Sequence, residues 1–387
     1  MGNTVLLTVR GPSGREWSRS FHGDSYGYDA APAVMTANDN VENVCEPDDE
    51  IYRLVYETTA KVARDRLACY GLGGASAWST VDRALHERDE SGAATTVRLD
   101  ADETLAEHAI EWATTLTNDE AKNGERGWQL LIEAMDGLFK TEELWPMLHG
   151  LAVLTAAAPP ETVIRIDMSD SDWAWEDHEG ALLVDYWPIE LSSLQPAALL
   201  CEGVFDARVF THAIAATHPH LTSHLLNPDF GFDREGGSAA LTRLVRGLAS
   251  VGVRDSRIIA VFDADRTGNL EAERLKGVEL PPNFTVTTLP HLRALERYPV
   301  IGPELTSDTD VNGWGAALET YLAVEMGMTA PLVLSYEHGR AGGYQGVLPK
   351  PDKARVQEAF ETQRLTSREW PVLQRIVQHL IHEPLSS

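Results

Sequence analysis

The second half of the chain alternates short apolar runs with segments whose apolar residues recur at helical spacing. The apolar runs are residues 198–201 and 257–262, and the segments with helical spacing are residues 207–216 and 238–251. Apolar runs of this length are typical of strands that are buried on both faces, and their alternation with helices is typical of a parallel sheet. The pattern therefore predicts an α/β fold in which helices flank a parallel sheet.

The first half is dominated by helical periodicity. Residues 4–10 predict a strand, and a helix is predicted to begin at Pro47, which suits a first turn and is followed by three acids. Its apolar face extends from Ile51 to Leu67. Similar segments predict helices at residues 76–88, 104–116, 128–139 and 144–157, and strands are predicted at residues 162–168 and 181–186. We therefore expect a mainly helical N-terminal domain ahead of the sheet.

These elements divide the chain into five parts. The parts are residues 1–46, a strand and loop; residues 47–158, a helical domain; residues 159–196, a strand-rich connector; residues 197–300, the sheet domain; and residues 301–387, a helical extension. Pro159 and Pro160 mark the end of the helical domain, because consecutive prolines are typical of a break between elements.

Acidic residues follow both apolar runs of the sheet domain. Glu202 follows the first run, and Asp263 and Asp265 follow the second. The carboxyl ends of parallel strands meet at one edge, and side chains two residues apart on a strand share a face, so we expect these carboxylates to lie close together. Like charges repel unless a cation lies between them, and Mg²⁺ or Mn²⁺ prefers oxygen ligands. The sequence therefore predicts a site for one or two such ions. In the plainer interpretation, Glu202 begins a loop and Asp265 caps the next helix.

A pair of glycines, Gly236 and Gly237, precedes the segment at residues 238–251. Glycine allows a backbone to approach a ligand closely, and the N–H groups at a helix N-terminus favour anions. Together with Ser238, the pair is a candidate phosphate-binding turn. A turn with no ligand is the equally weighted alternative.

The two strand ends resemble the Toprim (topoisomerase–primase) domain. The residues concerned are Leu-Leu-Cys-Glu-Gly at 199–203, with Asp206, and Ala-Val-Phe-Asp-Ala-Asp at 260–265. Further segments are similar to the HEPN/Toprim-associated proteins, a bacterial subfamily related in its Toprim part to the overcoming-lysogenisation-defect nucleases. These segments are Gly236-Gly237-Ser238-Ala239, Leu289-Pro290, Tyr298-Pro299, Asn312-Gly313, Glu319-x-Tyr321-Leu322 and Tyr344-Gln345-Gly346. The resemblance covers roughly residues 196–360.

The resemblance implies a Toprim-like metal-dependent nuclease in which Glu202, Asp263 and Asp265 are catalytic and bind the metal. It implies Asp206 and Glu319 as further metal ligands, the latter from the extension at residues 301–387. It also implies a lysine that stabilises charge at the scissile phosphate, near Lys350 or Lys353, and we assign this role to Lys350. For Asp206 the alternative is an acid in the first turn of a helix, and for Glu319 it is an exposed position.

The resemblance further implies a bacterial anti-phage defence role, with activity held back until infection or a partner releases it. The HEPN part of the subfamily name is linked to an Arg-x4–6-His motif, but Arg83 and His86 have only two residues between them. We therefore expect the N-terminal half to have a structural, regulatory or oligomerising role.

The charge of the chain limits how it can bind nucleic acid. It carries 59 acidic against 32 basic residues, a formal net charge of −27. Phosphate backbones bind mainly to clustered cations, so DNA or RNA binding requires either a local basic groove or a separate partner subunit, in a homo-oligomer or hetero-complex. Three widely spaced cysteines indicate neither zinc nor a disulfide framework, and no segment predicts a membrane span, so we expect a cytoplasmic protein.

Two alternatives to a general nuclease stay open. The first is a non-catalytic Toprim-like scaffold or subunit of a defence complex, and the second is an endoribonuclease for tRNA or other structured RNA. The sequence has no Gly-x4-Gly-Lys-Ser/Thr loop, so any ATPase has to be a separate partner.

Overall fold

The computed structural model of the chain comprises two compact units, Met1–Gln195 and Pro196–Ser387. The structure describes residues 4–22, 55–73, 77–81, 83, 104–118, 120–139, 144–170, 195–228, 236–253, 256–302, 306–337, 343–366 and 368–382. The strand predicted at residues 181–186 lies outside these ranges, as do much of the helix predicted at residues 76–88 and all of residues 47–54. No helix within the described ranges is long and apolar enough to cross a membrane.

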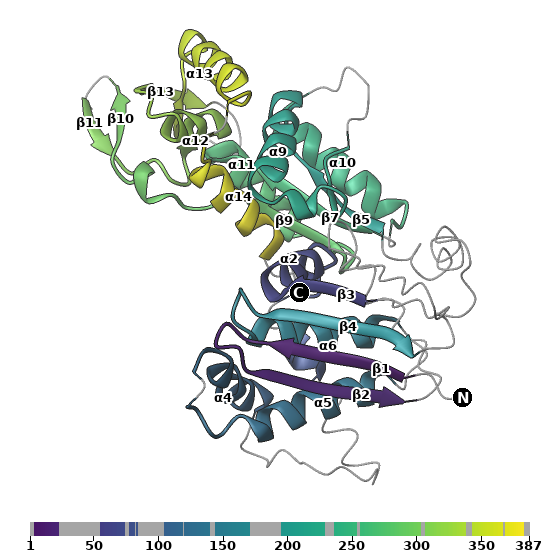
Figure 1. Cartoon of the computed structure of the whole chain (residues 1–387). Coiled ribbons are helices and arrows are strands. Elements are labelled where there is room, and N and C mark those ends of the chain that lie inside the picture. The colour runs from purple at the N-terminus through teal and green to yellow at the C-terminus, as the bar shows by residue number, and fades with distance from the viewer. Residues whose placement is uncertain are drawn as a thin grey trace, which may run out of the picture. The chain divides into compact units, whose positions relative to one another are not determined.

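The N-terminal unit is built on an antiparallel sheet with the order β2-β1-β4-β3 (Figure 1). Its strands are β1 (Thr4–Arg10), β2 (Glu16–His22), β3 (Val55–Thr59) and β4 (Val163–Asp170). Leu7 and Val9 of β1 are buried and alternate with more exposed neighbours, as expected for a sheet with one face in the core.

Among the described residues, four helices contribute to the core of this unit together with the sheet. They are α2 (Ala60–Cys69), α4 (Leu105–Thr117), α5 (Glu125–Phe139) and α6 (Leu144–Ala157). A capping box begins α4, because Thr104 accepts a hydrogen bond from the Glu107 N–H and the Glu107 side chain accepts one from the Thr104 N–H. The rings of Trp112 and Trp128 stack with centroids 5.6 Å apart in the core between α4 and α5.

The helix predicted from Pro47 is wrong over residues 55–59, which form β3. Tyr56 and Thr58 are buried there, whereas Glu57 and Thr59 are half-buried, and this alternation is typical of a strand. The helix begins only at Ala60, where the Thr59 side chain accepts a hydrogen bond from the Val62 N–H. The mainly helical domain expected at residues 47–158 is therefore not observed as such, because its helices pack on a sheet that includes β1, β2 and β4.

The C-terminal unit contains a second sheet with the order β6-β5-β7-β9. Its strands are β5 (Gln195–Leu200), β6 (Leu225–Leu226), β7 (Ser256–Phe262) and β9 (Phe284–Thr288), and β5 pairs in parallel with β6 as β7 does with β9. Helices α9 (Val204–Thr217), α10 (Ser238–Ser250) and α11 (Arg266–Lys276) connect them, with a short 3₁₀ helix at Pro219–Leu221. The predicted α/β class and the parallel strand pairing are confirmed for this part of the chain.

Helices cover both faces of this sheet (Figure 1). Ile258, Ala260 and Phe262 of β7 share a core with residues of α10 and α11. Successive strand residues point to opposite faces, so Arg257 points away from this core. Its Nη1 donates to the Ile381 carbonyl oxygen at 3.1 Å. Ile381 belongs to α14 (Pro371–His382), which also packs on α9, so these two helices lie on the other face.

The extension expected to be helical at residues 301–387 contains a further sheet with the order β11-β10-β13-β14. Its strands are β10 (Tyr298–Ile301), β11 (Thr306–Thr309), β13 (Leu332–Glu337) and β14 (Gly343–Val347). The remaining elements of the unit are β8 (Ala264–Asp265), β12 (Gly315–Ala316), α12 (Leu318–Glu325), α13 (Lys350–Gln363) and a 3₁₀ helix at Arg293–Leu295.

A short antiparallel pairing between β8 and β12 connects this extension to the segment that directly follows β7. Gly315 lies opposite Asp265, and Ala316 opposite Ala264. Residues 315 and 316 of the extension expected to be helical therefore form β12, and α12 begins only at Leu318. The carboxyl end of β7 is thereby placed next to the start of α12.

Candidate functional site

The carboxyl ends of β5 and β7 are joined by one acidic side chain. Glu202 follows β5, and its Oε1 accepts a hydrogen bond of 3.0 Å from the Asp263 N–H, which follows β7. The two strands are neighbours in the sheet, so their ends meet at one edge as predicted. The structure therefore brings Glu202 and Asp263 together.

Asp206 lies in the first turn of α9 and its side chain turns back toward the same edge. A Cβ atom added at Gly203 would lie 3.2 Å from Asp206 Oδ2, so the carboxylate lies directly over this glycine. The charge of Asp206 affects the pKa values of both Glu202 and Asp263. Asp206 is thus both an acid in the first turn of a helix and a neighbour of the two strand-end carboxylates.

Asp265 is held by donors on both carboxylate oxygens. Its Oδ1 accepts a hydrogen bond of 2.7 Å from the Gly268 N–H, which caps α11. Its Oδ2 accepts one of 2.8 Å from Nε2 of Gln345 on β14. The capping role considered for Asp265 is therefore confirmed, and it coexists with proximity to the other acids.

Glu319 reaches the site because Asp263 fixes the start of α12. Asp263 Oδ1 accepts a hydrogen bond of 2.8 Å from the Leu318 N–H. Glu319 is only 4% exposed, so the exposed alternative for this residue is wrong. Its Oε1 lies 2.8 Å from the Lys353 ammonium and accepts a hydrogen bond of 2.9 Å from Gln357 Nε2.

We refer to Glu202, Asp206, Asp263, Asp265 and Glu319 together as the acidic cluster. Burial raises the pKa of the Asp263 carboxyl well above its ordinary value, and the charges of the other four members raise it further. Burial also raises the pKa of Glu202, from 4.5 to about 7, and Asp265 and Asp206 contribute in the same direction. The hydrogen bond from the Asp263 N–H and the charge of Lys353 oppose this rise.

Lys353 is the cation that faces the acidic cluster. Partial burial lowers the pKa of its ammonium, but Glu319, Asp206 and Asp263 outweigh that effect and raise it. Lys350, to which the catalytic role was assigned, begins α13 three residues earlier and is exposed. The structure pairs Lys353 with Glu319, and the catalytic role of Lys350 stays a prediction.

The donor chemistry of the acidic cluster fits a hard divalent cation. All five members offer carboxylate oxygens, and their mutual repulsion is what a cation would relieve. Among the described residues, no three His, Cys, Asp or Glu side chains already form a group that could hold a metal ion. The cluster therefore fits a cation by the chemistry of its ligand atoms and by its local negative charge, and not by a preformed coordination geometry.

The glycine turn predicted to bind phosphate lies against Glu202. The Gly237 N–H donates to the Glu202 carbonyl oxygen at 2.9 Å, and Gly237 has φ +98°, a conformation that favours glycine. The N–H of Gly237 is thus engaged in linking α10 to the end of β5. Phosphate binding by Gly236, Gly237 and Ser238 stays a prediction.

No role was predicted for Gln345, Gln357 or Thr267, of which the first two contact the acidic cluster. Gln345 and Gln357 donate to Asp265 and Glu319, and Thr267 donates to Gln345. Gln357 lies four residues after Lys353, so one face of α13 carries both partners of Glu319, a spacing that is visible in the sequence. Gln345 lies 80 residues from Asp265, and no local signal connects the two.

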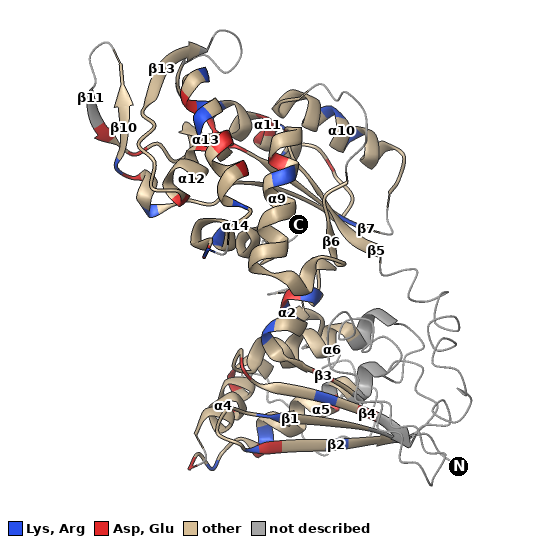
Figure 2. Ribbon diagram, turned by 45° about the horizontal axis from the view of Figure 1, so that its top comes forward, with Lys and Arg blue, Asp and Glu red and all other residues tan. Residues whose placement is uncertain are grey.

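The charges around this end of the unit are mixed. Figure 2 shows both acidic and basic residues on α9, α11 and α13. Examples are the ion pair of Arg208 with Glu361, at 3.2 Å, and that of Lys353 with Glu319. Part of the basic charge is therefore balanced by acids within the unit.

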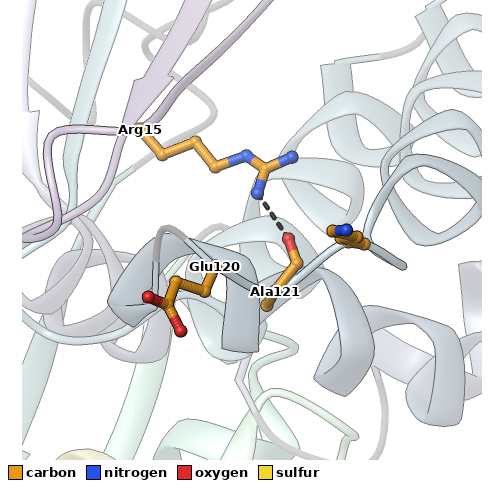
Figure 3. Close-up of a pocket in the computed structure, with 4 residues that line it drawn as sticks. Arg15, Glu120 and Ala121 are labelled. Carbon is orange, nitrogen blue, oxygen red and sulfur yellow. Dashed lines mark hydrogen bonds between the residues drawn. The ribbon is translucent and has the colours of Figure 1, made fainter.

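A surface pocket in the N-terminal unit is a weaker candidate. It is lined by Arg15, Glu120, Ala121 and Lys122 (Figure 3). Arg15 Nη1 donates to the Ala121 carbonyl oxygen at 2.6 Å, and its guanidinium lies 5.2 Å from the centre of the Trp17 ring. This cation is therefore already engaged, and Glu120 and Lys122 are exposed.

Comparison with known proteins leaves the family open. No protein-family model matches the chain, and no curated protein or solved structure matches it. The fold and the site define the class as a mixed α/β protein with an acidic cluster at one edge of a sheet.

The raised pKa values predict how stability depends on pH. Between pH 4.5 and about 7, the folded protein keeps a proton on Glu202 that the unfolded chain has lost. Stability should therefore fall as pH rises through this window, by roughly 2–3 kcal/mol from Glu202. Thermal unfolding from pH 4 to 8 measures this, with Glu202→Gln expected to show a shallower decline. A wild-type curve parallel to that of Glu202→Gln would contradict the prediction.

Proposed function

We propose that the chain is a metal-dependent phosphodiesterase, most simply a nuclease of Toprim type. The observation that carries the proposal is the acidic cluster at the carboxyl edge of a partly parallel sheet, with Lys353 beside it. Mutually raised pKa values of this kind are typical of sites whose charge a ligand balances. The resemblance to Toprim domains supports the same assignment.

Glu202, Asp263 and Asp265 are the residues that would hold Mg²⁺ or Mn²⁺, with Asp206 and Glu319 next to them. When bound, such a cation stabilises negative charge that develops at a phosphoryl group and lowers the pKa of bound water. Burial and the neighbouring acids raise the pKa of Glu202 in the cation-free site, so a bound cation would relieve the cost of ionising this carboxylate.

Lys353 supplies the positive charge that this site needs for a phosphodiester. Its side chain is 49% exposed, so the ammonium can leave Glu319 for a phosphate oxygen without being drawn out of a closed core. The neighbouring carboxylates raise its pKa, so it stays protonated at neutral pH. A fixed cation at the scissile phosphate stabilises the charge of the transition state.

The biological setting of the proposal comes from the resemblance alone. It suggests an anti-phage defence effector in bacteria, acting on DNA or RNA and released by infection or by a partner subunit. A net charge of −27 is consistent with an enzyme that binds nucleic acid weakly until a partner adds cationic surface.

The test is a cleavage assay of the full chain on plasmid, single-stranded DNA and tRNA with Mg²⁺ or Mn²⁺. We expect cleavage that chelation abolishes and that Glu202→Gln reduces by at least 100-fold, since it removes a charged ligand of the proposed metal site. Glu273→Gln on α11 is the matched control, because Glu273 is exposed and pairs only with Lys276 among the described residues. Cleavage that persists in Glu202→Gln, or no cleavage of any substrate with either metal, would contradict the proposal for the isolated chain.

A further inference from the structure

Asp265 is connected to a residue in a different sheet through a short chain of hydrogen bonds. Gln345 of β14 donates from Nε2 to Asp265 Oδ2 at 2.8 Å. Thr267, in the first turn of α11, donates from its hydroxyl to Gln345 Oε1 at 2.9 Å. Gln345 is 8% exposed, so both ends of its amide are satisfied by protein within the unit.

The direction of these hydrogen bonds is set by the carboxylate. An ionised carboxylate only accepts, so Gln345 has to present its NH₂ group to Asp265 and its oxygen to Thr267. The Thr267 hydroxyl then has to donate. A single orientation of the amide therefore satisfies all three groups, and the Thr267 hydroxyl anchors the amide oxygen in that orientation.

Backbone pairing places Gln345 at this position. Gly315 of β12 lies opposite Asp265, and the Gly346 N–H donates to the Trp314 carbonyl oxygen at 3.2 Å. Residue 345 thus lies beside β12, and β12 lies beside β8. The distance between Gln345 and Asp265 is consequently fixed by the main chain as well as by the side chains.

We propose that Thr267 and Gln345 are positioning residues that hold the Asp265 carboxylate in the orientation that binds a divalent cation. This inference rests on the proposed metal site. Gly268 and Gln345 donate to different oxygens of the Asp265 carboxylate, and a carboxylate oxygen can accept from such a donor and also bind a metal ion. Loss of the Gln345 donor would remove one of the hydrogen bonds that fix the orientation of this carboxylate. Hydrogen-bonding partners of metal ligands typically change metal affinity by about 10–100-fold.

The experiment is calorimetric titration of the full chain with Mn²⁺, with the free energy of unfolding measured on the same samples. Thr267→Val removes the hydroxyl that anchors the Gln345 amide oxygen and so loosens the donor to Asp265, and we expect Mn²⁺ affinity to fall by about 10–100-fold. Thr267→Ser keeps the hydroxyl and should restore wild-type affinity. Gln345→Met keeps the volume of the side chain and removes the amide, so it should weaken Mn²⁺ binding as Thr267→Val does. It provides the same test if Thr267→Val does not fold.

Thr242→Val is the matched control. Its hydroxyl also donates to a carboxylate of the same unit, Glu271, at 3.0 Å, but Glu271 lies outside the acidic cluster. We expect Thr242→Val to cost stability and to leave Mn²⁺ affinity unchanged.

The outcomes separate this inference from the proposed function. If the wild type does not bind Mn²⁺, the proposed metal site fails, and the inference fails with it. If the wild type binds and both Thr267→Val and Gln345→Met bind equally well, the inference alone is overturned. It is also overturned if Thr267→Ser is as weak as Thr267→Val, or if Thr242→Val weakens binding to the same extent.

Discussion

Asp263→Asn is expected to abolish divalent-cation binding and cleavage, and to make the cation-free protein more stable. Asparagine keeps an Oδ1 that accepts from the Leu318 N–H, so the start of α12 is preserved. It removes the negative charge that the other four acids oppose. The loss of affinity should exceed the 10–100-fold typical of an outer-shell partner, because Asp263 is a proposed ligand.

The gain in stability is the sharper part of this prediction. Ionising the buried Asp263 carboxyl is unfavourable without a cation, so replacing it should stabilise the protein at pH 8 by about 1–2 kcal/mol. Thermal unfolding with and without Mn²⁺ measures both effects, and the variant should show no stabilisation by Mn²⁺. Asp308→Asn, at an exposed position on β11, should change neither the stability of the cation-free protein nor its stabilisation by Mn²⁺. If Asp263→Asn were less stable and still responded to Mn²⁺, the site would be misassigned.

Gly268→Ala is expected to destabilise the C-terminal unit by about 3 kcal/mol, the upper end for overpacking. A Cβ atom at this position would overlap the Asp263 carbonyl oxygen, which is backbone and cannot move aside as a side chain can. The Gly268 N–H also caps α11 by donating to Asp265 Oδ1. Displacing Gly268 therefore displaces Asp263 and Asp265 together, and Mn²⁺ binding should be lost as well.

Gly247→Ala is the matched control for this substitution. Gly247 lies in α10, and a Cβ atom there would have no neighbour within 4 Å. The same change should therefore stabilise the protein by about 0.5–1 kcal/mol, because alanine loses less backbone entropy in a helix. Chemical denaturation of both variants provides the comparison, and equal effects would contradict the structural argument for Gly268.

The edge of the sheet could be predicted because its signals are local. The apolar run that became β7 ends at Asp263, and β5 ends two residues before Glu202, so parallel pairing alone brings the two acids together. The helices α6, α9 and α10 follow from apolar spacing within single segments. In each case the residues that determine the element lie within the element.

The errors arise where a partner distant in sequence decides the structure. Residues 55–59 carry apolar side chains that fit a helix or a strand, and pairing with β4 makes them a strand. Residues 315 and 316 form β12 because they pair with β8, and α12 begins where Asp263 accepts from the Leu318 N–H. The contact of Gln345 with Asp265 likewise depends on the arrangement of β14, β12 and β8.

The central claim is that the acidic cluster binds a divalent cation, and anomalous diffraction tests it most directly. Crystals of the full chain soaked in Mn²⁺ should give an anomalous peak among Glu202, Asp263 and Asp265, and crystals of Asp263→Asn should lack it. A peak only at other positions, or none at a Mn²⁺ concentration well above the measured dissociation constant, would contradict the account.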